Sequence, residues 1–287
     1  MPLLRGAWIL AVFCMPDSWY NRAKHEPAER SPGFWDRERC RWERRKMKIL
    51  LVDTSGPVCG VAIAADGDLV YEAFMKNKMT HSQKVMPMVE DALMRSDLGL
   101  SDLDAFAAVV GPGSFTGVRI GVATVKGLAE ACGKPCIAVD ALEALAENGR
   151  YFEGIVCPIL DARAGQVYGA AFRPGDRVER LVMDEALKLT EFLDRIEAFG
   201  GPYLFVGDGI GVHRAAIEER LGMACRFHSP AMAALRPGCA ALLAMQKLQE
   251  GKQVSPEALL PLYLRAPQAE RERLAKAAQS RVEPSGV

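Results

Sequence analysis

The densest chemical signal in the sequence is a glycine-rich segment that also carries two hydroxyl side chains. In the string GPGSFTGVRIG these residues are Gly111, Gly113, Ser114, Thr116, Gly117 and Gly121. Glycine allows positive φ and lets backbone N–H groups approach an anion, and a following helix adds the positive end of its dipole. The segment is therefore a candidate phosphate loop, although it matches neither Walker A nor GxGxxG. A tight strand-to-helix turn with close helix packing explains the same glycines.

A second polar group, Asp53-Thr54-Ser55, ends the hydrophobic run KILLV. Carboxylates and hydroxyls at a strand end can hold a metal ion or a phosphate, and the alternative is a turn capped by short polar side chains. Asp161 and the turn at 207–209 allow the same two interpretations. Because such turns close buried strands in both halves of the chain, we expect a cleft between two lobes.

The sequence gives little support to nucleophilic or metal chemistry. His25, His81, His213 and His228 stand apart without an i, i+4 partner, and neither HExxH nor GxSxG occurs. We therefore expect no catalytic residue and no metal ligand, and we interpret His81 as a capping or surface residue. The cysteines from Cys59 onward sit singly in apolar segments, as reduced thiols of a cytoplasmic protein do.

Composition separates the first 46 residues from the rest of the chain. The protein is 49% hydrophobic and 25% charged with a formal net charge of zero, so it lacks the positive field that direct RNA binding needs. Residues 1–46 hold all four tryptophans, ten basic and six acidic side chains. We expect 1–46 to be a disordered extension or a mis-assigned start ahead of Met47, and 268–287 to be a charged tail. The apolar run at 6–15 is shorter than the roughly 20 residues that a membrane span needs, so no membrane association is expected.

Hydrophobic patterning predicts an α/β protein of two related lobes. A strand at 48–53 and a hairpin at 59–75 open the chain with three antiparallel strands. Residues 80–96 have helical spacing, and Pro87 would kink that helix or delay its start. ILDARAGQVY echoes LLVDTSGPVC, with Asp161 lying 108 residues after Asp53. We place the first lobe at 47–149 and the second, with a closing helix, at 150–267.

Five motifs together resemble the TsaB (YeaZ) family over roughly residues 47–265: DTS, HSQKVMP, VVGPGSFTGVRIG, ILDARAGQVY and PLYLR. The resemblance implies an actin-like/Hsp70-like (ASKHA) fold of mixed sheets flanked by helices. It also implies a non-catalytic, dimerising subunit of the bacterial complex that makes threonylcarbamoyladenosine beside the tRNA anticodon. Its partners would be a TsaD-type transferase and a TsaE-type ATPase, with tRNA contacted only through the complex.

The resemblance assigns partner contacts to the helix that carries HSQKVMPMVEDAL, which in the family packs on its counterpart in TsaD or in a second copy. The implied contact residues are His81, Val85, Met86, Val89 and Leu93. Methionines in this stretch suit an adaptable interface as well as a core. A homodimer is expected in isolation. No cofactor is expected to be intrinsic. ATP or ADP would bind at the interface of the complex, near the glycine segment and the Asp53-Thr54-Ser55 turn.

One stretch distinguishes this chain from the catalytic relative, which carries two histidines four residues apart. Here the equivalent stretch is VDALEAL, with Ala141 and Leu145 at the ligand positions, and neither side chain binds a metal. A second hypothesis stays open: a self-sufficient, ATP-dependent phosphotransferase of the actin-like superfamily that uses Asp53 and the glycine segment. A metallopeptidase is disfavoured by the missing histidine pair.

Overall fold

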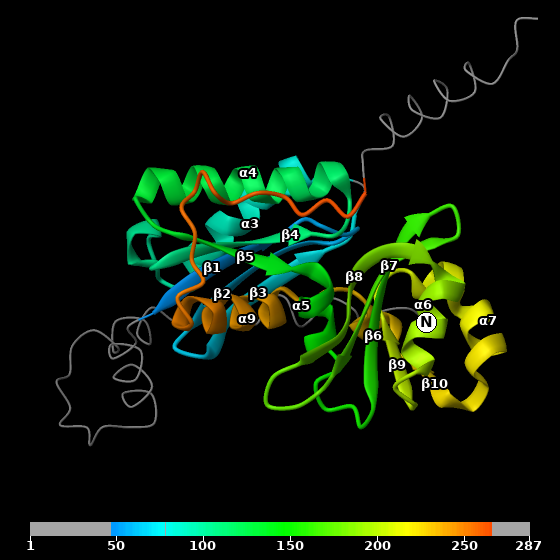
Figure 1. Cartoon of the computed structure of the whole chain (residues 1–287). Helices are drawn as coiled ribbons and strands as arrows, with labels where there is room; N and C mark the ends of the chain where they lie inside the picture. The colour runs from blue at the N-terminus through cyan, green and yellow to red at the C-terminus, as the bar shows by residue number, and fades with distance from the viewer. Residues whose placement is uncertain (1–46, 78, 266–287) are drawn as a thin grey trace, which may run out of the picture. The chain divides into compact units, whose positions relative to one another are not determined.

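The computed structural model describes residues 47–77 and 79–265, and these form two lobes, each built on a five-stranded mixed sheet (Figure 1). The expectations for residues 1–46 and for the tail at 268–287 lie outside the described residues. In the first sheet the strand order is β3-β2-β1-β4-β5, and in the second it is β10-β9-β6-β7-β8.

The first sheet begins with three antiparallel strands, as predicted from the Asp-Gly hairpin. They are β1 (Lys48–Asp53), β2 (Cys59–Ala65) and β3 (Asp68–Met75). On the other side of β1, β4 (Ala105–Gly111) and β5 (Cys136–Asp140) pair in parallel. Because parallel strands end at the same edge, the carboxyl ends of β1 and β4 lie together.

The second sheet repeats this arrangement. Its strands are β6 (Ile155–Arg163), β7 (Gln166–Arg173), β8 (Glu179–Lys188), β9 (Tyr203–Val206) and β10 (Cys225–Phe227). β6, β7 and β8 are antiparallel neighbours, whereas β9 and β10 follow β6 in parallel. The repeat seen in the sequence and the two-lobed actin-like fold are therefore confirmed. The sequence pattern had not indicated β8 and β10.

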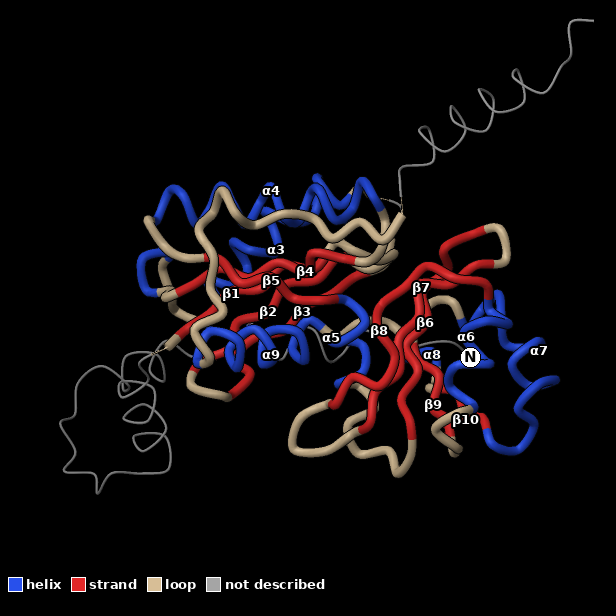
Figure 2. Tube along the Cα trace, viewed as in Figure 1, coloured by secondary structure: helices blue, strands red, loops and turns tan. Residues whose placement is uncertain are grey.

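Helices cover both faces of the first sheet (Figures 1 and 2). One face carries α3 (His81–Arg95) and α4 (Phe115–Cys132), and the other carries α9 (Pro237–Gln249), which packs on β1, β2 and β3. α9 thus comes from the second half of the chain but covers the first sheet, and the predicted lobe boundary at 149 stays a prediction. α3 runs through Pro87 without a late start.

Shorter helices complete the described chain. α5 (Ala141–Glu147) follows β5 and packs on α9 and on β6. The second lobe has α6 (Leu189–Glu197), α7 (Ile210–Leu221), the 3-10 turn η2 (Gly222–Ala224) and α8 (Pro230–Ala233). The 3-10 turn η1 (Leu100–Asp102) precedes β4 in the first lobe. Neither α6 nor α8 was predicted from the hydrophobic pattern.

The two lobes share a hydrophobic core. One cluster of buried side chains extends from the first sheet through α5 and α9 into the second sheet, and it includes Ile49, Leu142, Met245, Phe172 and Leu204. Because burial of apolar surface stabilises at about 25 cal/mol per Å², any motion that separated the lobes would expose part of this cluster at a substantial cost. The lobes are therefore held as a single block along this cluster.

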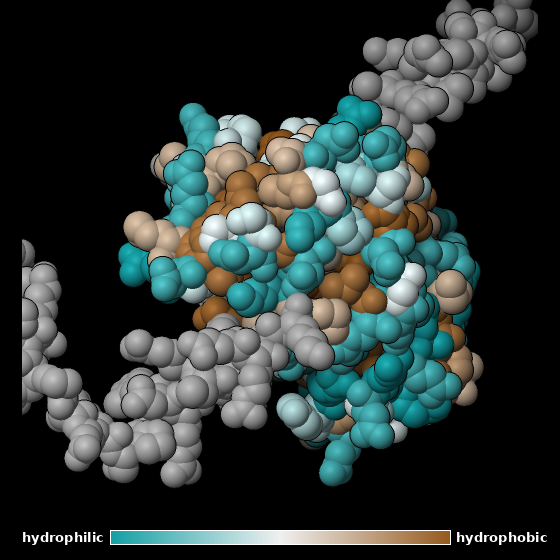
Figure 3. Space-filling model, turned by 90° about the vertical axis from the view of Figure 1, so that its left-hand side faces the viewer, coloured by the Kyte–Doolittle hydropathy of each residue, from teal (hydrophilic) through white to brown (hydrophobic). Residues whose placement is uncertain are grey.

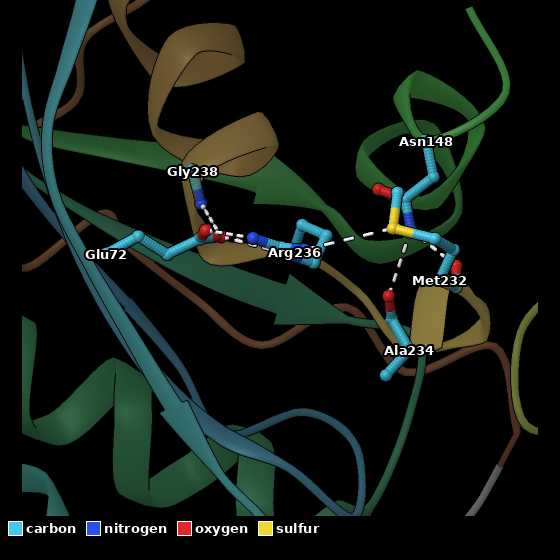
Figure 4. A network of polar contacts seen from close by, with 6 residues as sticks. All are labelled: Glu72, Asn148, Met232, Ala234, Arg236 and Gly238. Atoms are coloured by element: carbon cyan, nitrogen blue, oxygen red, sulfur yellow. Dashed lines mark hydrogen bonds and ion pairs between the residues drawn. The ribbon is translucent and has the colours of Figure 1, made fainter. Parts of the chain in front are cut away.

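Polar contacts fasten the same junction (Figure 4). Glu72 on β3 receives hydrogen bonds from the Arg236 guanidinium (Nε to Oε1, 3.1 Å) and from the Gly238 N–H (2.9 Å). Asn148, just after α5, donates to the carbonyls of Met232 (3.0 Å) and Ala234 (2.9 Å). These bonds tie residues 232–238 to β3 and to the end of α5, close to where the chain passes between the lobes.

After α9 the chain forms a C-terminal strap, residues 252–265, that runs beside α4 (Figure 1). Val254 exchanges two backbone hydrogen bonds of 2.9 Å with Cys136, and the Leu262 N–H donates to Val110 O at 2.8 Å. Leu259 is 1% exposed in the core beneath α4, and Lys126 Nζ donates to its carbonyl at 3.3 Å. The strap is thus an integral part of the first lobe.

The strap gives a prediction about stability. Leu259→Ala should lower the free energy of unfolding by about 2–4 kcal/mol, because it leaves a cavity in a closed core. Leu260→Ala is the matched control, since the neighbouring side chain is 67% exposed, and it should change stability by less than about 0.5 kcal/mol. Urea unfolding of both variants checks the difference, and equal effects would show that the strap does not pack as described.

Candidate functional site in the cleft between the lobes

A cavity of about 610 Å³ lies between the lobes and brings together residues that the sequence analysis singled out. Its lining includes Ser55, His81, Gly113, Ser114, Thr116, Asp161 and Asp208. They come from the ends of β1, β4, β6 and β9 and from the starts of α3 and α4. The strand-end turns of both halves therefore meet at one cleft, as the sequence led us to expect.

The N-terminus of α4 borders this cavity. Ser114 caps the helix, because its Oγ accepts a hydrogen bond from the Gly117 N–H at 3.2 Å, and its own N–H donates to Ser55 O at 2.7 Å. Phe115 and Thr116 follow in the first helical turn, where N–H groups have no acceptor within the helix, and both line the cavity. The positive end of the α4 dipole is therefore available to a ligand in the cleft.

The glycines of the segment are required by close packing. A Cβ at Gly113 would lie 2.3 Å from Ser55 O, one at Gly117 would lie 2.1 Å from Thr54 O, and one at Gly121 would lie 2.5 Å from Thr54 Oγ1. The Thr54 hydroxyl also donates to Gly117 O at 2.7 Å. Of the two interpretations of this motif, the packing one accounts for the spacing of these glycines, and phosphate binding stays a prediction.

Gly111 precedes this contact and meets a different constraint. Its φ of +116° is unfavourable for any residue with a side chain, and a Cβ there would lie 2.7 Å from Leu262 O in the strap. Gly111 and Gly117 are buried and are not among the residues that line the 610 Å³ cavity. Glycine at 111 thus allows β4, α4 and the strap to meet.

Asp53 and Thr54 are buried beneath the cleft. Asp53 is 2% exposed and Thr54 0% exposed. Asp53 Oδ1 accepts hydrogen bonds from the Ser55 N–H at 2.8 Å and from Ser55 Oγ at 2.7 Å, while burial raises the pKa of the Asp53 carboxyl. Asp53 borders a smaller cavity of about 40 Å³, and of the Asp53-Thr54-Ser55 turn it is Ser55 that lines the larger one.

The second lobe contributes a turn that the sequence analysis did not identify as strained. Arg163 (φ 63°) and Ala164 (φ 53°) adopt the left-handed conformation between β6 and β7, which is unfavourable for residues with a Cβ. Asp161 Oδ1 accepts from the Arg163 N–H at 2.8 Å, and Asp208 Oδ1 accepts from the Asp161 N–H at 3.1 Å. This turn places Arg163 in the cavity lining.

The C-terminal strap supplies further lining residues that the motif PLYLR alone did not reveal. Tyr263 stacks on Phe115 with ring centroids 4.7 Å apart, and its hydroxyl accepts from Arg119 Nε at 2.9 Å. Arg265 Nη1 donates to Ala162 O at 2.8 Å and so connects the strap to the second lobe. The cavity is thus bordered by two arginines, Arg163 and Arg265, and by the N-terminus of α4.

His81 is the first residue of α3, and Thr80 is the N-cap. The interpretation of His81 as a capping residue is therefore wrong. Its Nε2 lies 2.9 Å from Gly56 O, and its Nδ1 is buried without a hydrogen-bond partner among the described residues. His81 instead fixes the β1–β2 loop at the edge of the cavity.

The residues that the resemblance assigned to partner contacts divide between two sides of α3. Val85 and Val89 are 2% and 1% exposed and pack in the core of their own lobe. Met86 is 39% exposed and Met94 is 71% exposed, whereas Leu93 is half-buried. Any surface that α3 offers to a partner therefore includes Met86 and Met94 and excludes the two valines.

Exposed apolar side chains also occur away from α3. Met183 on β8 and Met223 in η2 are 67% and 86% exposed. On the face drawn in Figure 3, hydrophobic residues lie in separate patches between hydrophilic ones. Exposure alone therefore does not single out α3 as an interface.

Further observations concern the chemistry expected of the chain. Ala141 and Leu145, where the resemblance would place the catalytic relative's histidines, are each 1% exposed within α5. Residues 47–77 and 79–265 contain no cluster of three or more histidine, cysteine or carboxylate side chains suited to a metal ion. The same stretch has no helix with the length and hydrophobicity of a membrane span.

The fold and the cleft define a two-lobed α/β protein of the actin-like class, and comparisons with known proteins narrow this class. The family model described as TsaD, tRNA N6-adenosine threonylcarbamoyltransferase, matches residues 76–273. The TsaB protein of Bacillus subtilis is 37% identical over 78% of this chain and 96% of its own length. That of Escherichia coli is 33% identical over 76% of this chain and 95% of its own.

A solved structure agrees with these sequence matches. YeaZ from Pseudomonas aeruginosa superposes with a TM-score of 0.65 at 28% identity, over 76% of this chain and all of the other. The chain belongs to the TsaB (YeaZ) family.

The glycine contacts give a prediction within one helix. Gly117→Ala should lower the free energy of unfolding by about 1–3 kcal/mol, because its Cβ would overlap the fixed Thr54 carbonyl. Gly127→Ala is the matched control on α4, since a Cβ there meets no described atom within 4 Å. Alanine there should stabilise by about 0.5–1 kcal/mol through helix propensity. Chemical unfolding measures both, and a neutral Gly117→Ala would refute the packing explanation.

Proposed function

We propose that the chain is a non-catalytic scaffold subunit in tRNA threonylcarbamoyladenosine biosynthesis, where it supports a TsaD-type transferase. The observation that carries the proposal is its identity of 37% to a Bacillus subtilis protein named for that pathway, over 96% of that protein's length. A TsaE-type ATPase would join the assembly, and tRNA would be contacted through the complex. The isolated chain would form a homodimer.

The exposed side of α3 is the surface we propose for the paralogue. Met79, Met86 and Met94 are 52%, 39% and 71% exposed along this helix and the residues before it. Methionine side chains adapt to different partners because they are unbranched and polarisable. Val85 and Val89 hold the helix to its own lobe from the opposite side. The same element would therefore serve a second copy or the paralogue without rearranging the core.

The self-sufficient phosphotransferase is the less favoured function. A general base must reach the reacting hydroxyl within hydrogen-bond distance, whereas the Asp53 carboxylate is 2% exposed and already accepts two hydrogen bonds from Ser55. The shared core between the lobes also resists the opening and closing by which such enzymes exclude water. Both observations favour a supporting role.

We further propose that the 610 Å³ cavity is where ATP or ADP binds in the assembled complex. The α4 N-terminus offers N–H groups and positive potential to phosphate, and Arg163 and Arg265 add two guanidinium groups to the lining. Guanidinium groups pair with phosphate oxygens in a bidentate manner. Asp161 and Asp208 also line the cavity, so the phosphates would lie toward α4 and the strap.

Partner capture tests the scaffold function. In the full chain, Met86→Glu/Met94→Glu should stay folded, because both side chains are exposed, and should reduce capture of the TsaD-type paralogue at least about tenfold by burying two charges. Met183→Glu/Met223→Glu is the matched control in the second lobe, with both methionines exposed. Co-purification with unchanged circular dichroism measures the effect. Capture that is equal in both variants would exclude α3 as the interface, and no capture by the unsubstituted chain would refute the function.

Nucleotide binding is tested separately in the assembled complex. Arg163→Glu should weaken ATP or ADP binding at least about tenfold, because it replaces a favourable charge near the phosphates by a repulsive one. Arg173→Glu, at the far end of β7 and exposed, is the control and should leave binding unchanged. Titration calorimetry gives both dissociation constants. If the two variants bind equally, the nucleotide does not use this cavity.

A further inference from the structure

The turn between β6 and β7 brings an open guanidinium group to the cleft. Arg163 is exposed and lines the 610 Å³ cavity, and its side chain has no hydrogen bond or ion pair with residues 47–77 and 79–265. Arg265, the other arginine of the lining, already donates its Nη1 to Ala162 O at 2.8 Å. Of these two guanidinium groups, the one on Arg163 therefore has all of its donors open to a ligand.

A β-bulge decides on which side of the sheet Arg163 lies. Asp161 pairs with Val167 and Arg163 pairs with Gln166, so Ala162 is an extra residue on β6. Successive side chains of a regular strand alternate between the two faces of the sheet, and one inserted residue reverses that alternation for the residues beyond it. Without the bulge, Arg163 would lie on the opposite face.

The bulged turn has a backbone conformation that two of its residues do not favour. Arg163 and Ala164 have φ of 63° and 53°, and Gly165 follows with φ of 70°. Glycine adopts this left-handed region readily, whereas in the other two residues the Cβ comes too close to the following carbonyl oxygen. Such a conformation persists only where the surrounding structure holds it.

Asp161 holds this turn. Its Oδ1 accepts a hydrogen bond from the Arg163 N–H at 2.8 Å, and a bond to a charged acceptor is stronger than a neutral one. Its own N–H donates to Asp208 Oδ1 at 3.1 Å, which ties the turn to the end of β9. The two bonds fix the backbone on both sides of Ala162. The Asp161 carboxylate thus borders the cavity while it is engaged with its own backbone.

We propose that Asp161 is a positioning residue for the phosphates of a nucleotide in this cavity: its carboxylate holds the bulged turn, and the turn directs the Arg163 guanidinium toward the phosphates. The inference rests on the nucleotide site of the proposed function and adds a residue that acts on that site through Arg163. A carboxylate near a phosphate is unfavourable by charge alone. The hydrogen bond that Asp161 accepts and the charge that it carries therefore have opposite effects on binding.

Titration calorimetry of ADP with the assembled complex separates these effects. Asp161→Ala removes the acceptor, so the turn relaxes and the dissociation constant should rise roughly tenfold. Asp161→Asn keeps an oxygen acceptor but removes the charge, so ADP should bind at least as tightly as to the unsubstituted complex. Asp102→Ala is the matched control and should leave binding unchanged. Asp102 is also exposed, and its Oδ2 accepts the Gly99 N–H at 2.7 Å away from the cavity lining.

A double-mutant cycle shows whether Asp161 acts through Arg163. Arg163→Met should raise the dissociation constant for ADP about tenfold, because it removes the guanidinium donors. Adding Asp161→Ala to Arg163→Met should not raise it further, since the side chain that the turn directs is gone. Circular dichroism and urea unfolding show whether each variant keeps the fold.

Additive effects in this cycle would overturn the positioning role of Asp161. Equal weakening by alanine and asparagine at residue 161 would overturn it as well, because asparagine retains the acceptor. If the unsubstituted complex binds ADP and Asp161→Ala binds it equally well, this inference alone is wrong. If the unsubstituted complex binds no ADP, the nucleotide site of the proposed function is wrong, and this inference is wrong with it.

Discussion

The contact between the end of β1 and the start of α4 is the constraint on which the cleft depends. The carbonyls of Thr54 and Ser55 approach Gly117 and Gly113 so closely that no side chain fits between them. That approach sets the height of α4 above the sheet and brings its N-terminus to the cavity. It also buries Asp53 and leaves Ser55 in the cavity lining. The same glycine spacing that suggests a phosphate loop thus follows from packing, and any ligand would use a geometry that packing has already fixed.

The second determinant is the way in which the halves are joined. The repeated sheets share a hydrophobic cluster through α5 and α9, and the Glu72–Arg236 pair and Asn148 fasten the crossing segments. The strap adds a third connection through Arg265 and Ala162. Separating the lobes would therefore break these polar contacts and also expose the shared hydrophobic cluster. A rigid block of this kind suits a subunit that presents a surface to partners.

Much of the fold could be predicted from the sequence because it depends on local patterns. The strands were predicted from buried runs such as KILLV and from the Asp-Gly hairpin. The duplication was predicted from the similarity of two segments that lie 108 residues apart. β8 was not predicted, because it is a partly exposed strand whose apolar and polar residues do not clearly alternate. β10 was not predicted, because it has only three residues. The cleft was predicted in outline from its strand-end turns. Arg265 and Tyr263 were not, since a strap packed over α4 depends on contacts that are distant in sequence and leave no periodic signal.

Helix α3 shows why an interface cannot be located from apolar spacing alone. Val85 and Val89 are spaced so that they lie on the same side of α3, and this is the side that packs on the helix's own lobe. A partner surface has to be found among what remains, where the residues are Met86, Pro87, Glu90 and Met94. Lys84 is 3% exposed and belongs with the buried residues of this helix, although its side chain is charged. Burial, more than hydrophobicity, therefore separates the positions of this helix that pack in its own lobe from those that a partner could reach.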